Sequence, residues 1–376
     1  MKNLSIYIHI PFCDHKCIYC DFYSLISYEN VDSYLKALKK EIDHYSKRYS
    51  KDSRIISIFL GGGTPSYMEP GYISELIETI RSKFNLAEDA EITLETNPGT
   101  VSSEKLSKFK MSGVNRLSVG VQSFDENELK FLTRIHDAET AEKTILDAAE
   151  VGFENISLDL IFNLPKQTKV ILKRNLEKAT TLPIKHISAY SLILERGTIL
   201  NKMVIDGKVE IQDSDYDADL YEFTIDYLMS KGFLQYEVSN FAFKGYECVH
   251  NNSYWRYINY LGLGTSSHSF IDGVRWWNVS SLKMYLEMIN NKGFAKINQE
   301  ILSLDEKINE YIMLALRSSG LDKVDFQNRF ESDWLMKKNC ELIKLKQNGF
   351  LHEDDKFIKF TGKGYALCDE ILVNLL

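Results

Sequence analysis

Apolar and polar residues alternate in blocks over the first 240 residues of the chain. Short runs rich in β-branched and other apolar side chains predict buried strands at residues 6–10, 55–60, 92–96, 117–121, 156–161 and 187–192. Apolar residues spaced three or four apart between these runs predict helices, for example at residues 31–47, 73–84, 138–151 and 215–229. Six strands separated by helices predict an α/β fold with a parallel sheet, either open or rolled into a barrel.

The pattern changes beyond residue 240. Residues 241–281 are rich in aromatic residues, Gly, Ser and Asn, and we expect them to be irregular. Helices are predicted at 282–290, 304–318 and 334–347, followed by a hairpin that turns at 353–355 and a closing helix from Gly362. We therefore expect two tightly packed domains, residues 1–240 and residues 241–376, the second being smaller, mainly helical and similar to a winged helix.

Charge and composition narrow the class of protein. The net charge of −8, from 45 Lys and Arg against 53 Asp and Glu, argues against a nucleic-acid-binding surface and favours a structural use of the winged-helix-like part. No run of about 18 apolar residues predicts a membrane span. The N-terminal segment predicts a strand rather than a signal peptide, so we expect a cytoplasmic protein whose six cysteines are reduced.

Three of these cysteines form a short motif directly after the first predicted strand. Cys13, Cys17 and Cys20 have the spacing C-x3-C-x2-C, which lets one loop surround one iron–sulfur cluster. Three thiolates on a four-iron cluster leave one iron open to a small chelating ligand. The alternatives are a zinc site or three unrelated cysteines. Zinc sites usually pair two C-x2-C units, and the remaining cysteines are isolated: Cys248, Cys340 and Cys368.

Polar residues follow the predicted strands at the end where active sites of (β/α) barrels lie. The second strand leads into Gly61-Gly62-Gly63-Thr64-Pro65, whose glycines let the backbone approach a ligand closely. A carboxylate inside the apolar fifth strand, Asp159, requires a polar partner. Each residue taken singly could be a cap or a salt bridge, but the set predicts a ligand site at one rim: Thr64, Glu95, Gln122, Arg134, His136 and Asp159.

Together with YIHIPFC, GGGTP, GVQS, LTRIH, YEVSNFA and HNNSYW, these features extend over nearly the whole chain. They resemble the radical S-adenosylmethionine (SAM) superfamily, and within it the oxygen-independent coproporphyrinogen III oxidase family and its heme-chaperone branch. The resemblance implies a partial (β/α)6 barrel with a [4Fe–4S] cluster on Cys13, Cys17 and Cys20 and with SAM on the open iron. It implies SAM contacts from Tyr7, Tyr19, Gly62, Gly63, Thr64, Glu95, Gln122, Arg134 and Asp159, although Tyr19 could equally pack beside the cluster.

Two departures separate the chain from the oxidases of that family. Phe22 stands where the oxidases carry a fourth cysteine. The first strand is expected from about residue 4, so we expect no counterpart of the extension that precedes it in the oxidases. The resemblance to the chaperone branch implies a protein that binds heme and delivers it to client hemoproteins, without oxidase activity and with no assigned catalytic residue. The alternative function is the oxidase, which converts porphyrinogen propionates to vinyl groups.

The chaperone branch carries the pattern H-N-x-x-Y-W, linked there to heme. Here it is His250-Asn251-Asn252-Ser253-Tyr254-Trp255, and we expect His250 on an accessible surface as an axial ligand flanked by Tyr254 and Trp255. Cys248 and His268 are the rival ligands, and the structural alternative is that His250 caps a turn while the aromatic residues fill an interface. We expect contact with membranes only through membrane-bound client proteins. The sequence does not decide between a monomer and a homodimer.

Overall fold

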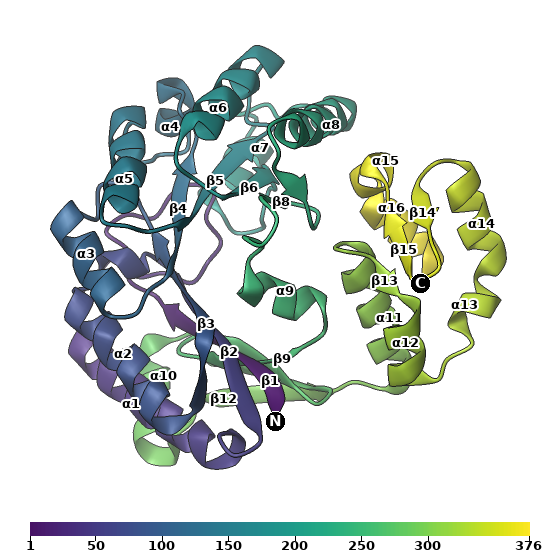
Figure 1. The fold of residues 1–376 in the computed structure, drawn as a ribbon. Helices are drawn as coiled ribbons and strands as arrows, with labels where there is room; N and C mark the ends of the chain where they lie inside the picture. The colour runs from purple at the N-terminus through teal and green to yellow at the C-terminus, as the bar shows by residue number, and fades with distance from the viewer.

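The molecule is built around one curved sheet with helices on its outer face (Figure 1). The computed structural model describes residues 1–376, and the strand order of the 12-stranded sheet is β12-β11-β10-β9-β1-β2-β3-β4-β5-β6-β8-β7. Its centre is six successive parallel strands, as the sequence predicts: β1 (Lys2–Ile10), β2 (Ser53–Gly62), β3 (Asn85–Thr96), β4 (Arg116–Gln122), β5 (Asn155–Phe162) and β6 (His186–Ser191).

The connections between these strands are helical. The larger helices lie on the outer, convex side of the sheet, so the six strands form a partial (β/α)6 barrel (Figure 1). The segments after β1 to β6 contain α1 (Val31–Tyr49), the 3₁₀ turn η1 (Pro65–Tyr67), α2 (Pro70–Lys83), α3 (Ser103–Met111), α4 (Glu126–Phe131), α5 (Ala138–Glu150), α6 (Lys169–Thr181), α7 (Ile199–Ile205) and α8 (Ser214–Ser230).

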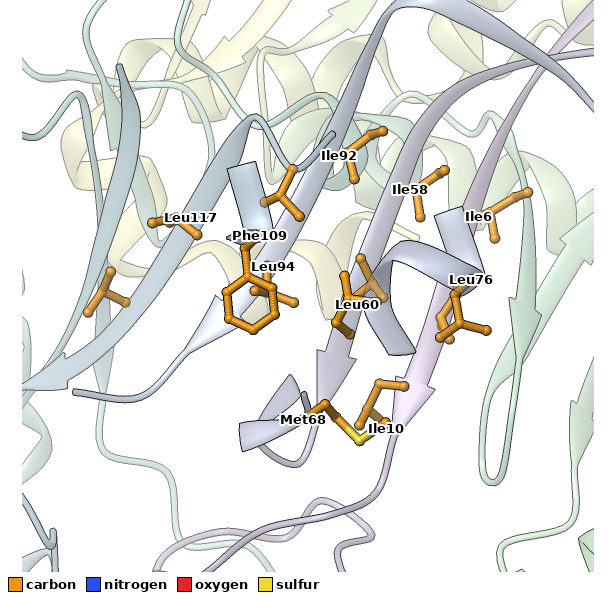
Figure 2. Close-up of a cluster of buried hydrophobic side chains, with 14 of the residues drawn as sticks. Ile6, Ile10, Ile58, Leu60, Met68, Leu76, Ile92, Leu94, Phe109 and Leu117 are labelled. Atoms are coloured by element: carbon orange, nitrogen blue, oxygen red, sulfur yellow. The ribbon is translucent and has the colours of Figure 1, made fainter. Parts of the chain in front are cut away.

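Alternation along each strand divides apolar from polar side chains. In β1, Ile6, Ile8 and Ile10 are fully buried in the larger hydrophobic core, while Tyr7 and His9 point to the opposite face. Figure 2 shows this core beneath α2 and α3, with side chains from four neighbouring strands packed together. The inner face of the barrel is consequently left to polar residues.

The sheet extends beyond the six parallel strands on both edges. Next to β6 lie β8 (Asn240–Ala242) and β7 (Leu234–Gln235), and next to β1 lies β9 (Asn259–Leu263), which runs parallel to it. Three antiparallel strands follow: β10 (His268–Ile271), β11 (Val274–Asn278) and β12 (Lys296–Ile301). The helices α9 (Val249–Trp255) and α10 (Leu282–Lys292) complete this segment. The expectation that residues 241–281 are irregular is therefore wrong.

A buried carboxylate explains why this polar segment is ordered. Glu41 of α1 accepts hydrogen bonds from the Gly264 N–H (2.8 Å), the Tyr285 hydroxyl (2.7 Å) and the Asn278 side-chain amide (2.7 Å). Burial raises the pKa of Glu41 to about 7. Since the three donors come from residues more than 220 positions away, the order of this segment depends on tertiary contacts rather than on its own sequence pattern.

The C-terminal unit has its own core and its own sheet. Its elements are α11 (Leu304–Leu316), β13 (Leu321–Asp322), α12 (Lys323–Phe330), α13 (Trp334–Lys337), α14 (Asn339–Gln347), β14 (Leu351–Glu353), β15 (Phe357–Phe360), α15 (Gly362–Ala366) and α16 (Cys368–Leu375). The strand order β13-β15-β14, with the predicted hairpin formed by β14 and β15, agrees with the winged-helix-like expectation. The helix expected at 334–347 is divided in two at Lys338.

The larger core ends at Ala295 and the smaller one begins at Ile308. The structure therefore places the change between units near residue 302 rather than near residue 240, because residues 241–301 pack on the sheet. The units contact each other through α8 and α15 and through α9 and α11, and the Tyr257 hydroxyl donates to Glu310 at 2.9 Å. None of the helices combines the length and the apolar character that a membrane span requires.

Candidate cofactor and ligand site

Two adjoining cavities occupy the inner face of the barrel. The first, about 440 Å³, is lined by the cysteine loop and the carboxyl ends of the strands, and we call it the cysteine cavity. The second, about 310 Å³, lies among Tyr7, Phe59, Arg116, His250 and Tyr254, and we call it the inner cavity. The two share six lining residues, namely Phe22, Gly62, Glu95, Ser118, Asp159 and Tyr190.

The three motif cysteines line the cysteine cavity together. All are free thiols, and the loop that carries them is fixed by the Cys13 N–H donating to the Leu25 carbonyl (3.0 Å) and the Cys20 N–H to the Cys17 carbonyl (3.2 Å). No three His, Cys, Asp or Glu side chains are grouped closely enough to hold a single metal ion. The thiols instead surround a space, which suits a larger, multi-iron group.

A chain of hydrogen bonds joins two of these cysteines across the cavity. Thr64 Oγ1 donates to Cys13 Sγ (3.5 Å) and accepts from Asn97 Nδ2 (3.0 Å). Arg134 donates to Asn97 Oδ1 (2.8 Å) and to Cys17 Sγ (3.6 Å), and its buried Nε has no partner. Donors directed at both sulfurs suit thiolate ligands, and the free Nε offers a further donor to an anionic ligand group.

The glycines of the GGGTP segment are required by the close approach of β1 and β2. A Cβ on Gly63 would lie 2.8 Å from the carbonyl oxygens of Ile10 and Phe12, which lead into the cysteine loop. Gly62 has φ of +113°, and a Cβ there would lie 2.4 Å from the His9 ring. Its N–H donates to Glu95 Oε2 at 3.0 Å. The segment thus brings backbone and carboxylate to the same wall of the cavity.

Two carboxyl groups meet at the boundary of the cavities. Burial and the neighbouring Asp159 raise the pKa of Glu95 to about 7, against the opposing hydrogen bond from Gly62. Burial also raises the pKa of Asp159 to about 6, and Ser118 Oγ donates to its Oδ1 at 3.3 Å. Neither group has a cation close enough to form a salt bridge, so both suit a ligand that brings a positive charge or hydroxyl donors.

The structure places most of the predicted SAM residues in one cavity. Gln122 and Tyr19 line the cysteine cavity, and the Tyr19 ring packs on the small core of Leu132, Ile161 and Leu164. Tyr7 lies apart, in the inner cavity, with its hydroxyl hydrogen-bonded to His9 Nδ1 (3.0 Å). Besides the three cysteines, the predicted SAM residues that line the cysteine cavity are Tyr19, Gly62, Gly63, Thr64, Glu95, Gln122, Arg134 and Asp159.

His250 is not on an accessible surface, contrary to expectation. It is 1% exposed, and hydrogen bonds join its Nδ1 to Ser57 Oγ (2.9 Å) and its Nε2 to the Tyr254 hydroxyl (2.8 Å). Burial lowers its pKa to about 3, so it is neutral. The rival ligand Cys248 is also fully buried, with its thiol donating to Glu91 at 3.4 Å. His250 anchors α9 and orients Tyr254.

A buried ion pair that holds α9 was not predicted from the sequence. Glu91 of β3 accepts from the N–H groups of Val249 and His250, both at 3.0 Å, and so satisfies the start of α9. The Arg116 guanidinium is 2% exposed and lies 3.8 Å from Glu91. The available signal was an arginine at the start of an otherwise apolar strand, since such a charge needs a partner inside.

A third cavity opens beside the cysteine loop. This aromatic cleft, about 390 Å³, is lined by Tyr7, His9, Asp21, Phe22, Tyr23, Tyr254, Tyr260, Ser266, Ser267 and His268. Phe22 lines all three cavities and is 61% exposed, so an apolar ring stands where the cleft meets the cysteine cavity. Tyr254 and Tyr260, which also line the cleft, pack edge-to-face with their ring centroids 4.6 Å apart.

Comparisons with known proteins agree with this architecture. Residues 7–178 match the radical SAM superfamily and residues 302–367 match the HemN C-terminal domain. The solved structure of coproporphyrinogen III oxidase (HemN) from Escherichia coli, described as a radical SAM enzyme, superposes with a TM-score of 0.85 at 25% identity and covers 100% of this chain and 90% of that one.

Curated relatives cover the chain from end to end. The heme chaperone HemW of Bacillus subtilis is 36% identical over 371 residues, 98% of this chain and 97% of the relative. That of Lactococcus lactis is 34% identical over 377 residues, 100% of this chain and 98% of the relative. The E. coli HemW is 38% identical over 278 residues, 73% of this chain and 72% of the relative.

The fold and the cysteine-lined cavity define a radical SAM protein, a class whose members carry a [4Fe–4S] cluster and SAM. Within that class the chain belongs to the HemW family. The resemblance inferred from the motifs is thereby confirmed.

Proposed function

We propose that this protein is a heme chaperone that binds heme at its surface and passes it to apo-hemoproteins. The observation that carries the proposal is the aromatic cleft, which opens beside the cysteine loop and is bordered by the exposed ring of Phe22. A porphyrin has two apolar faces, which stack on aromatic side chains. A cleft that leaves part of the heme exposed favours transfer of heme, because an acceptor protein can contact the heme before the chaperone releases it. The names of the relatives support the same function.

We further propose that Cys13, Cys17 and Cys20 hold a [4Fe–4S] cluster in the cysteine cavity and that SAM lies beside it. The thiol donors, the unpartnered Arg134 Nε and the carboxyls of Glu95 and Asp159 fit these groups. When bound, the cluster supplies an open iron for the amino and carboxylate groups of SAM and a source of electrons. The chain itself supplies the binding: Arg134 for an anionic group, and Glu95 and Asp159 for the N–H groups of the amine or the ribose hydroxyls.

This assignment predicts that the affinity for SAM rises with pH. The pKa of Glu95 is raised to about 7, so its charged form, which accepts hydrogen bonds from the amino group or the ribose hydroxyls of SAM, is lost as the pH falls below that value. The affinity should be about ten-fold higher at pH 8 than at pH 6, as expected if binding requires release of one proton with a pKa near 7. Equilibrium binding of SAM to the cluster-loaded protein at the two pH values measures this ratio of affinities.

Glu95→Gln should remove the ten-fold change, leaving only the smaller dependence that Asp159, with a pKa of about 6, contributes. It should also weaken binding at pH 8 by about 1–3 kcal/mol, since one charged hydrogen-bond partner is lost. Glu88→Gln is the matched control, because Glu88 lies on the same strand but is exposed. An unchanged pH profile in Glu95→Gln would exclude Glu95 from the SAM site.

The second candidate function is coproporphyrinogen III oxidation, which the likeness to the E. coli oxidase favours. Two observations argue against it. Phe22 replaces the fourth cysteine of the oxidases, and the inner cavity is confined to about 310 Å³ by Tyr7, Phe59 and Tyr254. A tetrapyrrole with four propionates is a large ligand for such a space, whereas a cleft at the surface accommodates a porphyrin edge.

The test is a pair of assays on one cluster-reconstituted preparation. Heme titration should saturate at about one heme per chain with a shifted Soret band. Decarboxylation of coproporphyrinogen under reducing conditions with SAM should be absent, with the E. coli oxidase as the positive control. Robust turnover would establish the oxidase, and a failure to bind heme would exclude the chaperone.

A further inference from the structure

An imidazole can bind heme iron only through a ring nitrogen that is free of other bonds, and the histidines near the cleft differ in this property. Three histidines lie at or directly behind the aromatic cleft, namely His9, His250 and His268. Hydrogen bonds join His9 Nδ1 to the Tyr7 hydroxyl (3.0 Å) and His9 Nε2 to the Tyr23 carbonyl (2.9 Å). Both nitrogens of His250 are likewise engaged. Neither ring can bind iron without losing a buried hydrogen bond, which is unfavourable.

His268, unlike His9 and His250, has an exposed ring whose nitrogens are free of hydrogen bonds. Its side chain is exposed at the start of β10, it lines the cleft, and no hydrogen bond of the protein engages its ring. The ring stacks on Trp277 of β11, with centroids 5.8 Å apart and planes at 24°. Stacking fixes the plane of the imidazole while leaving its edge, which carries the nitrogens, available to a ligand.

We infer that His268 is the axial ligand of heme in the aromatic cleft and that His250 acts as a positioning residue that holds Tyr254 as one wall. The inference rests on the proposed function and assigns its binding site. An imidazole nitrogen is a common protein ligand of heme iron. The Tyr254 hydroxyl is hydrogen-bonded to His250 Nε2 at 2.8 Å, so the H-N-x-x-Y-W motif contributes an aromatic wall through Tyr254 rather than an iron ligand.

The backbone beneath His268 is held closely enough to act as a fixed support. Gly262 of β9 packs directly on it, because a Cβ at Gly262 would lie 2.1 Å from the His268 carbonyl oxygen. The Gly262 N–H also donates to Ser269 Oγ at 2.9 Å, next to His268 in the chain. A side chain at position 262 would therefore displace the residue that bears the ligand.

The charges around the cleft indicate which edge of the porphyrin enters. The only acidic or basic side chain of the lining, apart from the histidines, is the exposed Asp21 carboxylate. Burial lowers the pKa of His9, to about 4, so that imidazole is neutral. Arg275, whose charge acts on His268, is paired with Glu300 and Glu310. An anionic propionate therefore finds no unpaired cation at this lining, and we expect the propionate edge to face solvent while the vinyl edge enters.

The test compares the heme spectra of single variants of the cluster-loaded, full-length protein. His268→Ala should lose the absorption and EPR signature of imidazole-ligated ferric heme, and added imidazole should restore it. His268→Met should give a thioether-type spectrum. His250→Ala should keep the imidazole signature of the wild type even where its affinity falls. His352→Ala, which removes an exposed histidine of β14, should change nothing.

The outcomes separate this inference from the proposed function. If the wild type binds heme and His268→Ala keeps the wild-type spectrum, His268 is not the ligand, although the chaperone function stands. If His250→Ala alone loses the imidazole signature, the ligand is His250 and the inference fails. If the wild type binds no heme, the proposed function fails together with the inference.

Discussion

Replacement of Cys13, Cys17 or Cys20 by alanine is expected to leave the protein without an iron–sulfur cluster. The three thiols are the cysteines that line the cysteine cavity, and a cluster held by three ligands cannot be retained by two. Iron and sulfide analysis after anaerobic reconstitution should fall from about four irons per chain to background. The broad thiolate-to-iron absorption should disappear with it.

The cysteines outside the motif provide the controls. Cys340 is exposed on α14 and Cys368 begins α16, both in the C-terminal unit. Cys340→Ala should retain the full iron content, and Cys368→Ala should do so in the fraction that folds, because this thiol is buried in the smaller core. A cluster that required either residue would contradict the three-ligand site.

Removal of Glu91 is expected to cause the largest loss of stability among the polar residues of the barrel. Glu91→Ala leaves the Arg116 guanidinium buried without a carboxylate and the first N–H groups of α9 without an acceptor. Breaking a buried ion pair by removing one partner costs about 3–5 kcal/mol. Urea denaturation followed by circular dichroism measures the change in the free energy of unfolding.

Asp89 is the matched control for this substitution. It lies two residues before Glu91 on the same strand and pairs with Arg54 at 2.9 Å, but its side chain is 84% exposed. Asp89→Ala should therefore change the free energy of unfolding by less than about 1 kcal/mol. Equal losses from Asp89→Ala and Glu91→Ala would show that burial of the Glu91–Arg116 pair has no structural importance.

The six parallel strands were predictable because their signal is local. Each is a short apolar run whose alternate residues enter the core, as Ile92 and Leu94 do in β3. The residues at the carboxyl ends were predictable for the same reason, since the ends of parallel strands meet at one rim. The cysteine cavity accordingly contains nearly all residues that the motifs indicated, from Cys13 to Asp159.

The strands after residue 240 were not predictable, because their polar residues are satisfied by distant partners. Asn278, the last residue of β11, is buried because its side-chain amide donates to Glu41 and to the Gly264 carbonyl. In the sequence, such residues are indistinguishable from those of an irregular loop. The early part of β3 was not predictable either. Its acidic residues around Glu91 do not resemble a buried strand, and the partner of Glu91, Arg116, lies on the neighbouring strand.

The position of His250 shows a different limit of prediction from sequence, which concerns the choice of a ligand. A histidine beside tyrosine and tryptophan has the chemistry of a heme ligand, and the sequence contains no record of the hydrogen bonds that Ser57 and Tyr254 make to its two nitrogens. Availability of a nitrogen, rather than the presence of an imidazole, decides ligation. That property belongs to the packing of α9 on β2 and β9.

The pairing of β9 with β1 has a consequence for how the chain acquires its structure during synthesis. The first strand, Lys2–Ile10, obtains one neighbour from residues 53–62, but its other neighbour is residues 259–263. Until about 260 residues have left the ribosome, the nascent sheet has an unpaired parallel edge that can attract other extended chains. Such long-range closure is slow. The barrel therefore completes its fold late in translation, and a truncated chain that ends before residue 259 should aggregate rather than fold.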